Sequence, residues 1–374
     1  MKVNDFNPVR LKSARLYRGK IIDVLAKETD VQKKDILAFE ESKYLPKLEN
    51  AQKLANALNF PIEYFYRKDK MKVLVENVHF AVPGSIPRVE EVAFREKLVM
   101  THKIVTFIEE NVSIPDLNLP TRLDRNLDME KLSVELRKYW NIGDAPIQNL
   151  GKIMEENGII ISTMNSGKKG LAPFTQKQSI NSKLRYLVCL GDDKGSQPRR
   201  NFDLAYELGY IIGDALKIPT KRFSKDEFAC ALLLPKESFF EDLENPNDLD
   251  SYVNLKKKYN TPIEAMLYRA NQIGILGYKP YNNLGRQMQA KGWLNQEPLD
   301  DTIKAKNPIL LTSAIDLMIK ENIVQSGNIS ETLSDIGIDI YEDEINVLLG
   351  LSSPKENNKT SKAKFNNKKN KVKK

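Results

Sequence analysis

The sequence predicts a mainly α-helical protein with one small β-sheet, an α+β fold. Through most of the 374 residues, apolar side chains recur every three or four positions, as they do in short amphipathic helices. Only residues 159–163 and 184–190 have the short apolar runs of buried strands. Charge is also segregated: residues 1–70 carry a net charge of +5, residues 352–374 carry +8, and the residues between carry −5. These observations predict a basic helical head, a body that holds the sheet and a basic tail.

The head, residues 1–70, is predicted to form five short helices between residues 7 and 66. Asn7 is a suitable N-cap for the first helix and Pro8 a suitable first residue. The other helices are predicted at 21–28, at 32–40, from Pro46 and from Pro61. Their landmarks, R-L-K-x-A-R, LA-x-x-x-x-V, I-x-x-F-E, P-x-L and LA-x-x-L-x-F-P-x-x-YF, are similar in order to those of the lambda-repressor-like helix-turn-helix domain.

The resemblance implies that the helix at 32–40 enters the major groove of DNA. The side chains expected to reach base edges are Gln32, Lys33 and Lys34, with Leu37 or Ala38 on a thymine methyl group. Ile21-Ile22 stand where the family usually has a Ser/Thr-Gln pair that contacts a phosphate. Because a phosphate contact needs charge, the expected replacements are Lys20, Lys43 and Lys47. The alternative is a solvated bundle or a protein-interaction module.

Residues 71–128 predict a linker and one long helix. Residues 73–87 are expected to be irregular, and Arg88 to Val112 to form the helix. Its apolar positions do not keep a heptad, so packing on the body is favoured over pairing between subunits. Helices at 129–140 and 147–157 then begin the main part of the body, residues 129–299.

The stretch NFDLAYELGY, residues 201–210, predicts a helix with one apolar face. Tyr206, Glu207 and Tyr210 stand where a zinc protease would carry His-Glu-x-x-His. In that motif two imidazoles one turn apart bind the metal, and the glutamate is the general base. A neutral phenol with a pKa of about 10 is a poor zinc ligand. Without a metal-bound water, the glutamate has nothing to deprotonate.

Together with FACALLLP at 228–235, this motif resembles the ImmA/IrrE-type metallopeptidase domain, over about residues 129–295. That zincin-like family usually reads RFDLAHELGH and then EAN-x-FAA-x-LLMP, which places its third zinc ligand at Ser224. Only the general base, Glu207, is present here. The resemblance therefore predicts the fold and argues against the activity.

We accordingly expect no catalytic residue, no metal and no cofactor. Tyr206, Glu207, Tyr210 and Ser224 are expected to form a vestigial pocket, with Ser166-Gly-Lys-Lys-Gly and Pro173-Phe-Thr at its mouth. That pocket either keeps a ligand or is merely filled by the two tyrosines.

The chain has two histidines and two cysteines, and none are spaced as a ligand pair: His79, His102, Cys189 and Cys230. Both cysteines are expected to be buried apolar residues. With so few cysteines, no apolar segment at the N-terminus and no long apolar run, we expect a cytoplasmic protein with no membrane contact.

The last part of the chain is again helical. Residues 252–276 predict two helices around Asn260-Thr261-Pro262, with Lys256 to Lys258 and Arg269 as a second candidate DNA contact or simply a solvated face. Residues 300–351 predict a helical C-terminal module for dimerisation or for a partner. Residues 352–374, with nine lysines and one glutamate, predict a disordered tail that raises nonspecific DNA affinity or serves solubility.

Together these features predict a sequence-specific DNA-binding transcriptional regulator, and the resemblance implies a repressor of a phage or mobile element. The expected partners are a double-stranded DNA operator, a second copy of the chain in a homodimer, and a protein or peptide inducer that binds the body. Two alternatives stay open. One is an active zinc endopeptidase in which Glu207 works with unconventional ligands, and the other is a protein-interaction antagonist that does not bind DNA.

Overall fold

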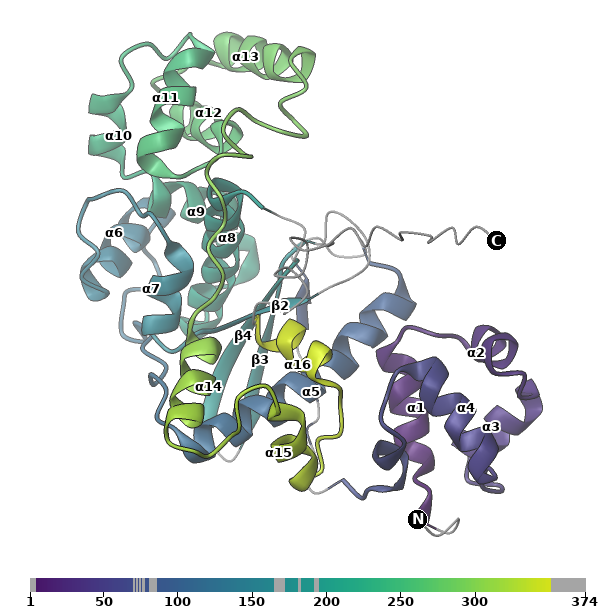
Figure 1. Ribbon diagram of the computed structural model, residues 1–374. Coiled ribbons are helices and arrows are strands. Elements are labelled where there is room, and N and C mark those ends of the chain that lie inside the picture. The colour runs from purple at the N-terminus through teal and green to yellow at the C-terminus, as the bar shows by residue number, and fades with distance from the viewer. Residues whose placement is uncertain are drawn as a thin grey trace, which may run out of the picture.

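The computed structural model describes residues 5–69, 71, 73, 75, 78–80, 86–164, 172–180, 183–191 and 195–350. Over these ranges helices dominate and four strands form one sheet, so the predicted α+β class is confirmed. The sheet lies at the centre, with the head to one side and the remaining helices around it (Figure 1). No helix in these ranges is long and apolar enough to span a membrane. The predicted tail at 352–374, and the segment from Ser166 to Gly170 that was expected at the mouth of the pocket, lie outside the described residues.

The five helices predicted for the head are present. They are α1 (Pro8–Tyr17), α2 (Ile22–Thr29), α3 (Lys33–Glu40), α4 (Leu48–Leu58) and the 3-10 helix η2 (Ile62–Tyr66). As predicted, Asn7 caps α1: its side chain accepts hydrogen bonds from the backbone N–H groups of Val9 and Arg10. Between α2 and α3, Asp30 has a φ of 54°, a left-handed conformation that a short polar side chain tolerates.

The sheet contains β1 (Val78–Phe80), β2 (Ile160–Met164), β3 (Phe174–Ile180) and β4 (Lys183–Gly191), in the order β1-β3-β4-β2. β3 is antiparallel to both β1 and β4, and β2 is parallel to β4. The two strands predicted from apolar runs are β2 and β4. The prediction of an irregular segment at 73–87 was wrong for residues 78–80, which form β1, and the strand β3, which begins at Phe174, was not predicted.

The two faces of the sheet belong to different parts of the core. Ile160, Phe174, Leu187 and Cys189 pack in a cluster with the long helix α5 (Arg88–Asn111) and the head. Ile161, Tyr186, Val188 and Leu190 pack on the opposite side, against α8 (Gln197–Ala215). As the sequence predicted, α5 is a single helix that packs on the body.

The C-terminal helices α14 (Leu310–Lys320), α15 (Ile329–Asp335) and α16 (Glu342–Leu349) join the head to the sheet. The Ser162 hydroxyl of β2 donates a hydrogen bond to the Leu348 carbonyl. From the head, the buried Arg10 guanidinium donates to Asp339 at 3.1 Å and to the Gly337 carbonyl at 2.9 Å. Head, sheet and C-terminal helices therefore share one continuous apolar core.

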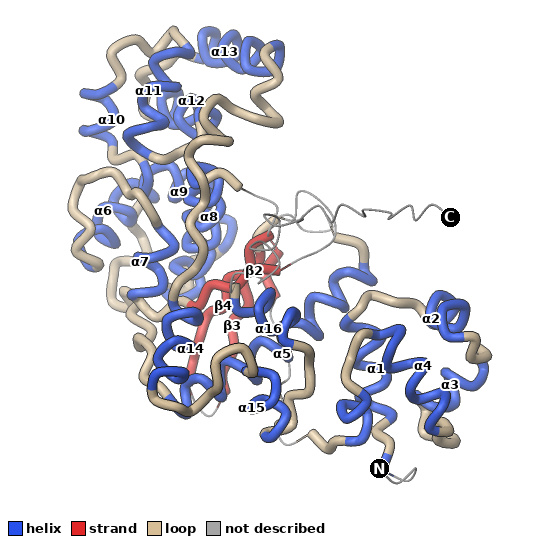
Figure 2. The backbone as a smooth tube through the Cα atoms, viewed as in Figure 1, coloured by secondary structure: helices blue, strands red, loops and turns tan. Residues whose placement is uncertain are grey.

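The rest of the body lies on the other side of the sheet. It contains α6 (Met129–Tyr139), α7 (Leu150–Glu156), η3 (Thr220–Arg222), α9 (Lys225–Leu233), α10 (Lys236–Asp242), α11 (Leu249–Tyr259), α12 (Ile263–Gln272) and α13 (Tyr278–Ala290). Helices α10 to α13 form the end of the molecule farthest from the C-terminal helices (Figure 2). The predicted break around Asn260 is present: its left-handed backbone ends α11, and Pro262 caps α12.

Candidate functional site

The four vestigial positions lie on two helices that pack against each other, α8 and α9. Tyr206 and Tyr210 are one turn apart on α8, Glu207 directly follows Tyr206, and Ser224 is the N-cap of α9. Ser224 Oγ accepts a hydrogen bond from the Glu227 N–H at 3.3 Å. This serine therefore serves the helix end rather than a metal.

Glu207 is fully buried, with 0% of its surface exposed. Its Oε2 accepts a hydrogen bond from the Thr175 hydroxyl of β3 at 2.5 Å. Its Oε1 is buried without a hydrogen-bond partner among the described residues. Burial raises the pKa of this carboxyl to about 7, although the Thr175 bond and the charge of Lys225 oppose the shift.

Lys225 and His79, which the sequence did not single out for this site, complete it. The Lys225 ammonium lies 4.3 Å from the ring centre of Tyr206 and donates a hydrogen bond to His79 Nε2 at 3.0 Å. The His79 ring stacks on Tyr210, with centroids 3.9 Å apart and an interplanar angle of 5°. Because an ammonium can only donate, the imidazole is neutral, and burial together with Lys225 lowers its pKa to about 4. Lys225 could have been singled out from the sequence, because it directly follows Ser224 at the third-ligand position. His79 could not, because it is 146 residues away from Lys225.

The side chains at this site do not suit zinc as ligands. Zinc needs neutral imidazoles, thiolates or carboxylates that converge on one point, and an ammonium lies among the groups here. Burial, followed by the charges of Asp214 and Glu207, raises the pKa of the Tyr210 phenol, so its anion is disfavoured further. Over the described ranges, no three His, Cys, Asp or Glu side chains gather closely enough to hold a metal ion.

The face of α8 that carries the vestigial residues also forms the walls of two cavities, one on each side of them. Residues three or four apart share a helix face, so the order along this face runs from Arg199 and Phe202 through Tyr206 to Gly213. Lys225, His79 and the two tyrosines lie between the cavities.

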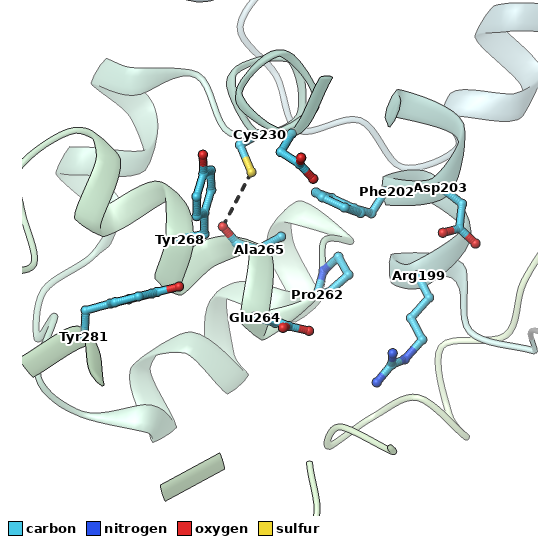
Figure 3. A pocket seen from close by; sticks show the side chains of 10 residues that line it. Arg199, Phe202, Asp203, Cys230, Pro262, Glu264, Ala265, Tyr268 and Tyr281 are labelled. Atoms are coloured by element: carbon cyan, nitrogen blue, oxygen red, sulfur yellow. Dashed lines mark hydrogen bonds between the residues drawn. The ribbon is translucent and has the colours of Figure 1, made fainter. Parts of the chain in front are cut away.

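The first, which we call the acidic cavity, has a volume of about 350 Å³ (Figure 3). Its lining includes Asp203, Asp226, Cys230, Glu264, Tyr268 and Tyr281. Cys230 points to the Ala265 carbonyl, with Sγ at 3.7 Å from the oxygen. As predicted, Cys230 and Cys189 are both buried.

The second, which we call the apolar cavity, has a volume of about 590 Å³. His79, Tyr210, Gly213, Ile218, Phe223 and Lys225 are among its lining residues. Gly213 allows the close approach of Phe223, because a Cβ at this position would lie 3.2 Å from the phenyl ring. The vestigial centre therefore consists of the rings of His79, Tyr206 and Tyr210 and the Lys225 ammonium. We call this cluster the plug, and it lies between two cavities of different chemistry.

Residues 154–271 match a family model described as the IrrE N-terminal-like domain of a peptidase family. The match runs from the end of α7, through the strands β2, β3 and β4 and the helices α8 and α9, to α12. No curated protein matches the chain. The chain thus contains a domain similar to the ImmA/IrrE type, as its motif predicted, with a plug at the position of the metal centre.

Most of the residues predicted to contact DNA are exposed, but Lys20 and Ala38 are not. Gln32, Lys33 and Lys34 at the start of α3 are exposed, as are Lys43 and Lys47, and Leu37 is 36% exposed. Lys20 is half-buried and donates to the Ala57 carbonyl and to Glu28. Ala38 is only 6% exposed and packs inside the head, so its proposed contact with a thymine methyl group was wrong.

The prediction of a second DNA contact at Lys256 to Lys258 and Arg269 was wrong for Lys256 and Arg269. Lys256 is fully buried and pairs with Glu297 and Asp300, each at 2.7 Å. Arg269 is also fully buried, and its guanidinium pairs with Glu130 at 2.7 Å. These charges hold α11 and α12 to the body and are inaccessible to DNA.

Proposed function

We propose that the protein is a DNA-binding transcriptional regulator whose body is a non-catalytic, ligand-responsive relative of a metallopeptidase. The observation that carries the proposal is the start of α3, where the consecutive residues Gln32, Lys33 and Lys34 are all exposed. A recognition helix reads base edges with its N-terminal residues, and Gln and Lys suit adenine and guanine edges.

The packing of the head supports this orientation. The helix α1 packs on α5 and fixes the head to the body, while α3 packs on α1 and α2, and α2 packs on α4. Tyr17 at the end of α1 and its C-cap Arg18 both donate hydrogen bonds to Glu344 of α16, at 2.7 and 2.6 Å. The head therefore contacts the rest of the protein through α1, and the cationic start of α3 would be accessible to a duplex.

Phosphate contacts would come from lysines beside this end. Lys43 and Lys47 lie in the segment between α3 and α4 and are exposed. Lys43 is paired with Glu41, but both side chains are more than half exposed, so this ion pair is weak and a phosphate can replace it. A dimer on a two-fold symmetric operator would double the area read, since one head covers too little DNA for useful specificity.

In this proposal the body regulates DNA binding and does not cleave peptide bonds. The plug of Lys225, His79 and the two tyrosines leaves no place for a metal-bound water, so Glu207 has no proton to abstract. A protein, peptide or small molecule that binds the body would change DNA occupancy only by its different affinity for the free and DNA-bound forms. Repression of a phage or mobile element is the role that the resemblance to helix-turn-helix proteins with an ImmA-type domain implies.

The test is fluorescence anisotropy of labelled duplexes from the DNA that flanks the gene, titrated with the intact chain. We expect saturable binding that weakens steeply with salt and is lost in the double variant Lys33→Ala/Lys34→Ala. The matched control is Lys138→Ala/Lys257→Ala, which removes the same charge from exposed body helices. Equal binding by the two double variants, or no saturable binding at all, would reject the proposal.

A further inference from the structure

We propose that the apolar cavity beside Lys225 binds a small carboxylic acid with an aromatic body. The carboxylate would bind the Lys225 ammonium, and the ring would lie between Tyr210 and Phe223. This inference goes beyond the proposed function and does not depend on DNA binding.

The size and walls of the cavity suit such a ligand. Its volume of about 590 Å³ lies in the range of small-molecule sites in proteins. Gly209 and Gly213 have no side chains, so the Phe223 ring packs directly on the backbone of α8 and forms this part of the wall. Phe223 and the stacked pair of His79 and Tyr210 supply flat aromatic surfaces, which favour another ring.

The charge of the cavity favours an anion. Lys225 and Lys217 line it, against one carboxylate, Asp214. Asp214 is already neutralised, since Lys177 donates to it at 2.7 Å and the Tyr186 hydroxyl donates to the same oxygen. The cavity therefore has an excess of positive charge in an apolar setting.

Lys225 is the group best placed to use this excess. In the part of the chain that the structure describes, it makes no ion pair with a carboxylate, and its hydrogen bond goes to the neutral imidazole of His79. Glu207 attracts the ammonium through space, but it is buried and forms no part of the cavity wall. An ammonium has three donors, so a ligand carboxylate can accept a charge-assisted hydrogen bond without breaking the bond to His79.

The acidic cavity on the other side of the plug would exclude the same ligand. Asp226 and Glu264 are carboxylates at its wall, and its one guanidinium, Arg199, is paired with Asp300 at 2.9 Å. An acid that binds this protein should therefore occupy the cavity next to Lys225 and Lys217.

The experiment compares hydrocinnamate with its uncharged isostere, hydrocinnamamide, by calorimetric titration of the intact chain without DNA. A hydrogen bond to a charged group predicts that the acid binds roughly tenfold to a hundredfold more tightly than the amide. Lys225→Met keeps the aliphatic packing and should remove this preference. Its matched control is Lys236→Met, because Lys236 is an exposed lysine at the first position of α10, as Lys225 is of α9.

Two further arms keep the test decisive. Thr220→Trp, at an exposed position of the cavity wall, should fill the cavity and weaken the binding of both compounds, with folding checked by circular dichroism. A short peptide that ends in phenylalanine separates a free acid from a chain terminus, and we expect it to bind no more tightly than hydrocinnamate. Equal affinity for acid and amide, a preference that survives in Lys225→Met, tighter binding of the peptide, or no binding at millimolar ligand would each overturn the inference. None of these results bears on DNA binding.

Discussion

The buried carboxyl of Glu207 gives a sharp prediction for the pH dependence of stability. In the folded chain its pKa is raised to about 7, because burial disfavours the anion and Oε1 has no partner among the described residues. In the unfolded chain the pKa returns to its ordinary value of 4.5. Between these two values the folded state holds more protons than the unfolded state, so the contribution of this group to stability falls as pH rises. Glu207→Gln has no such contribution.

The size of the effect follows from the two pKa values. The carboxyl lowers the free energy of unfolding by about 3 kcal/mol at pH 8 and by about 1 kcal/mol at pH 5.5. Relative to the parent protein, Glu207→Gln should therefore gain about 2 kcal/mol between pH 5.5 and pH 8. Any cost of burying an amide in place of the carboxyl is the same at both pH values and cancels in this difference.

Urea unfolding followed by tryptophan fluorescence is a suitable assay. Both tryptophans, Trp140 and Trp293, pack in or against the apolar cluster that contains α8, so the signal reports the part of the body that holds Glu207. Thr175→Val, which removes the single hydroxyl donor to Glu207 in the described part of the chain, should raise the pKa of the carboxyl further and steepen the pH dependence. If Glu207→Gln and the parent protein show the same change in unfolding free energy between the two pH values, the raised pKa of the buried Glu207 carboxyl is refuted.

Three other predictions concern packing and metal content. Lys256→Met should lower the free energy of unfolding by about 3 to 5 kcal/mol, because it leaves two buried carboxylates unpaired, whereas the exposed Lys257→Met should change it by less than about 0.5 kcal/mol. Equal effects in urea unfolding would contradict the buried ion network. Gly158→Ala should cost about 2 to 5 kcal/mol, since φ is +77° and a Cβ would lie 2.4 Å from the Asp116 carbonyl oxygen, whereas Gly143→Ala, with φ of +68° and open space, should cost about 1 to 2 kcal/mol. The reverse order in thermal unfolding would show that the close approach to residue 116 is wrong. Elemental analysis of the intact chain should find no stoichiometric zinc, because an ammonium lies among the would-be ligands, and one zinc per chain would revive the endopeptidase alternative.

Local chemistry explains why parts of the fold could be predicted. Helix starts carry their own signals, such as Asn7 with Pro8, and the buried strands β2 and β4 overlap the apolar runs at 159–161 and 186–190. β3 has the sequence FTQKQSI, whose polar residues favour no strand in isolation, and its pairing is decided by β1 and β4 on either side. No local pattern could therefore have revealed it.

The same distinction applies to the site. The vestigial positions on α8 could be predicted because the spacing of the motif remains when its ligands are lost. The plug could not, since it joins His79 of β1 to Lys225 of α9, and only the folded chain brings them together. Lys256 gives the converse case: a run of three lysines suggested an exposed surface, but the first of them turns inward to two carboxylates.

Selection of bound duplexes from a random pool by the intact chain is the most direct test of the main proposal. If the start of α3 reads base edges, successive rounds should converge on one motif, with two half-sites related by symmetry if the protein binds as a dimer. The motif should disappear with Lys33→Ala/Lys34→Ala and persist with Lys138→Ala/Lys257→Ala. A pool that stays random after repeated rounds, or the same motif from both double variants, would contradict the assignment of α3 as a DNA-reading helix.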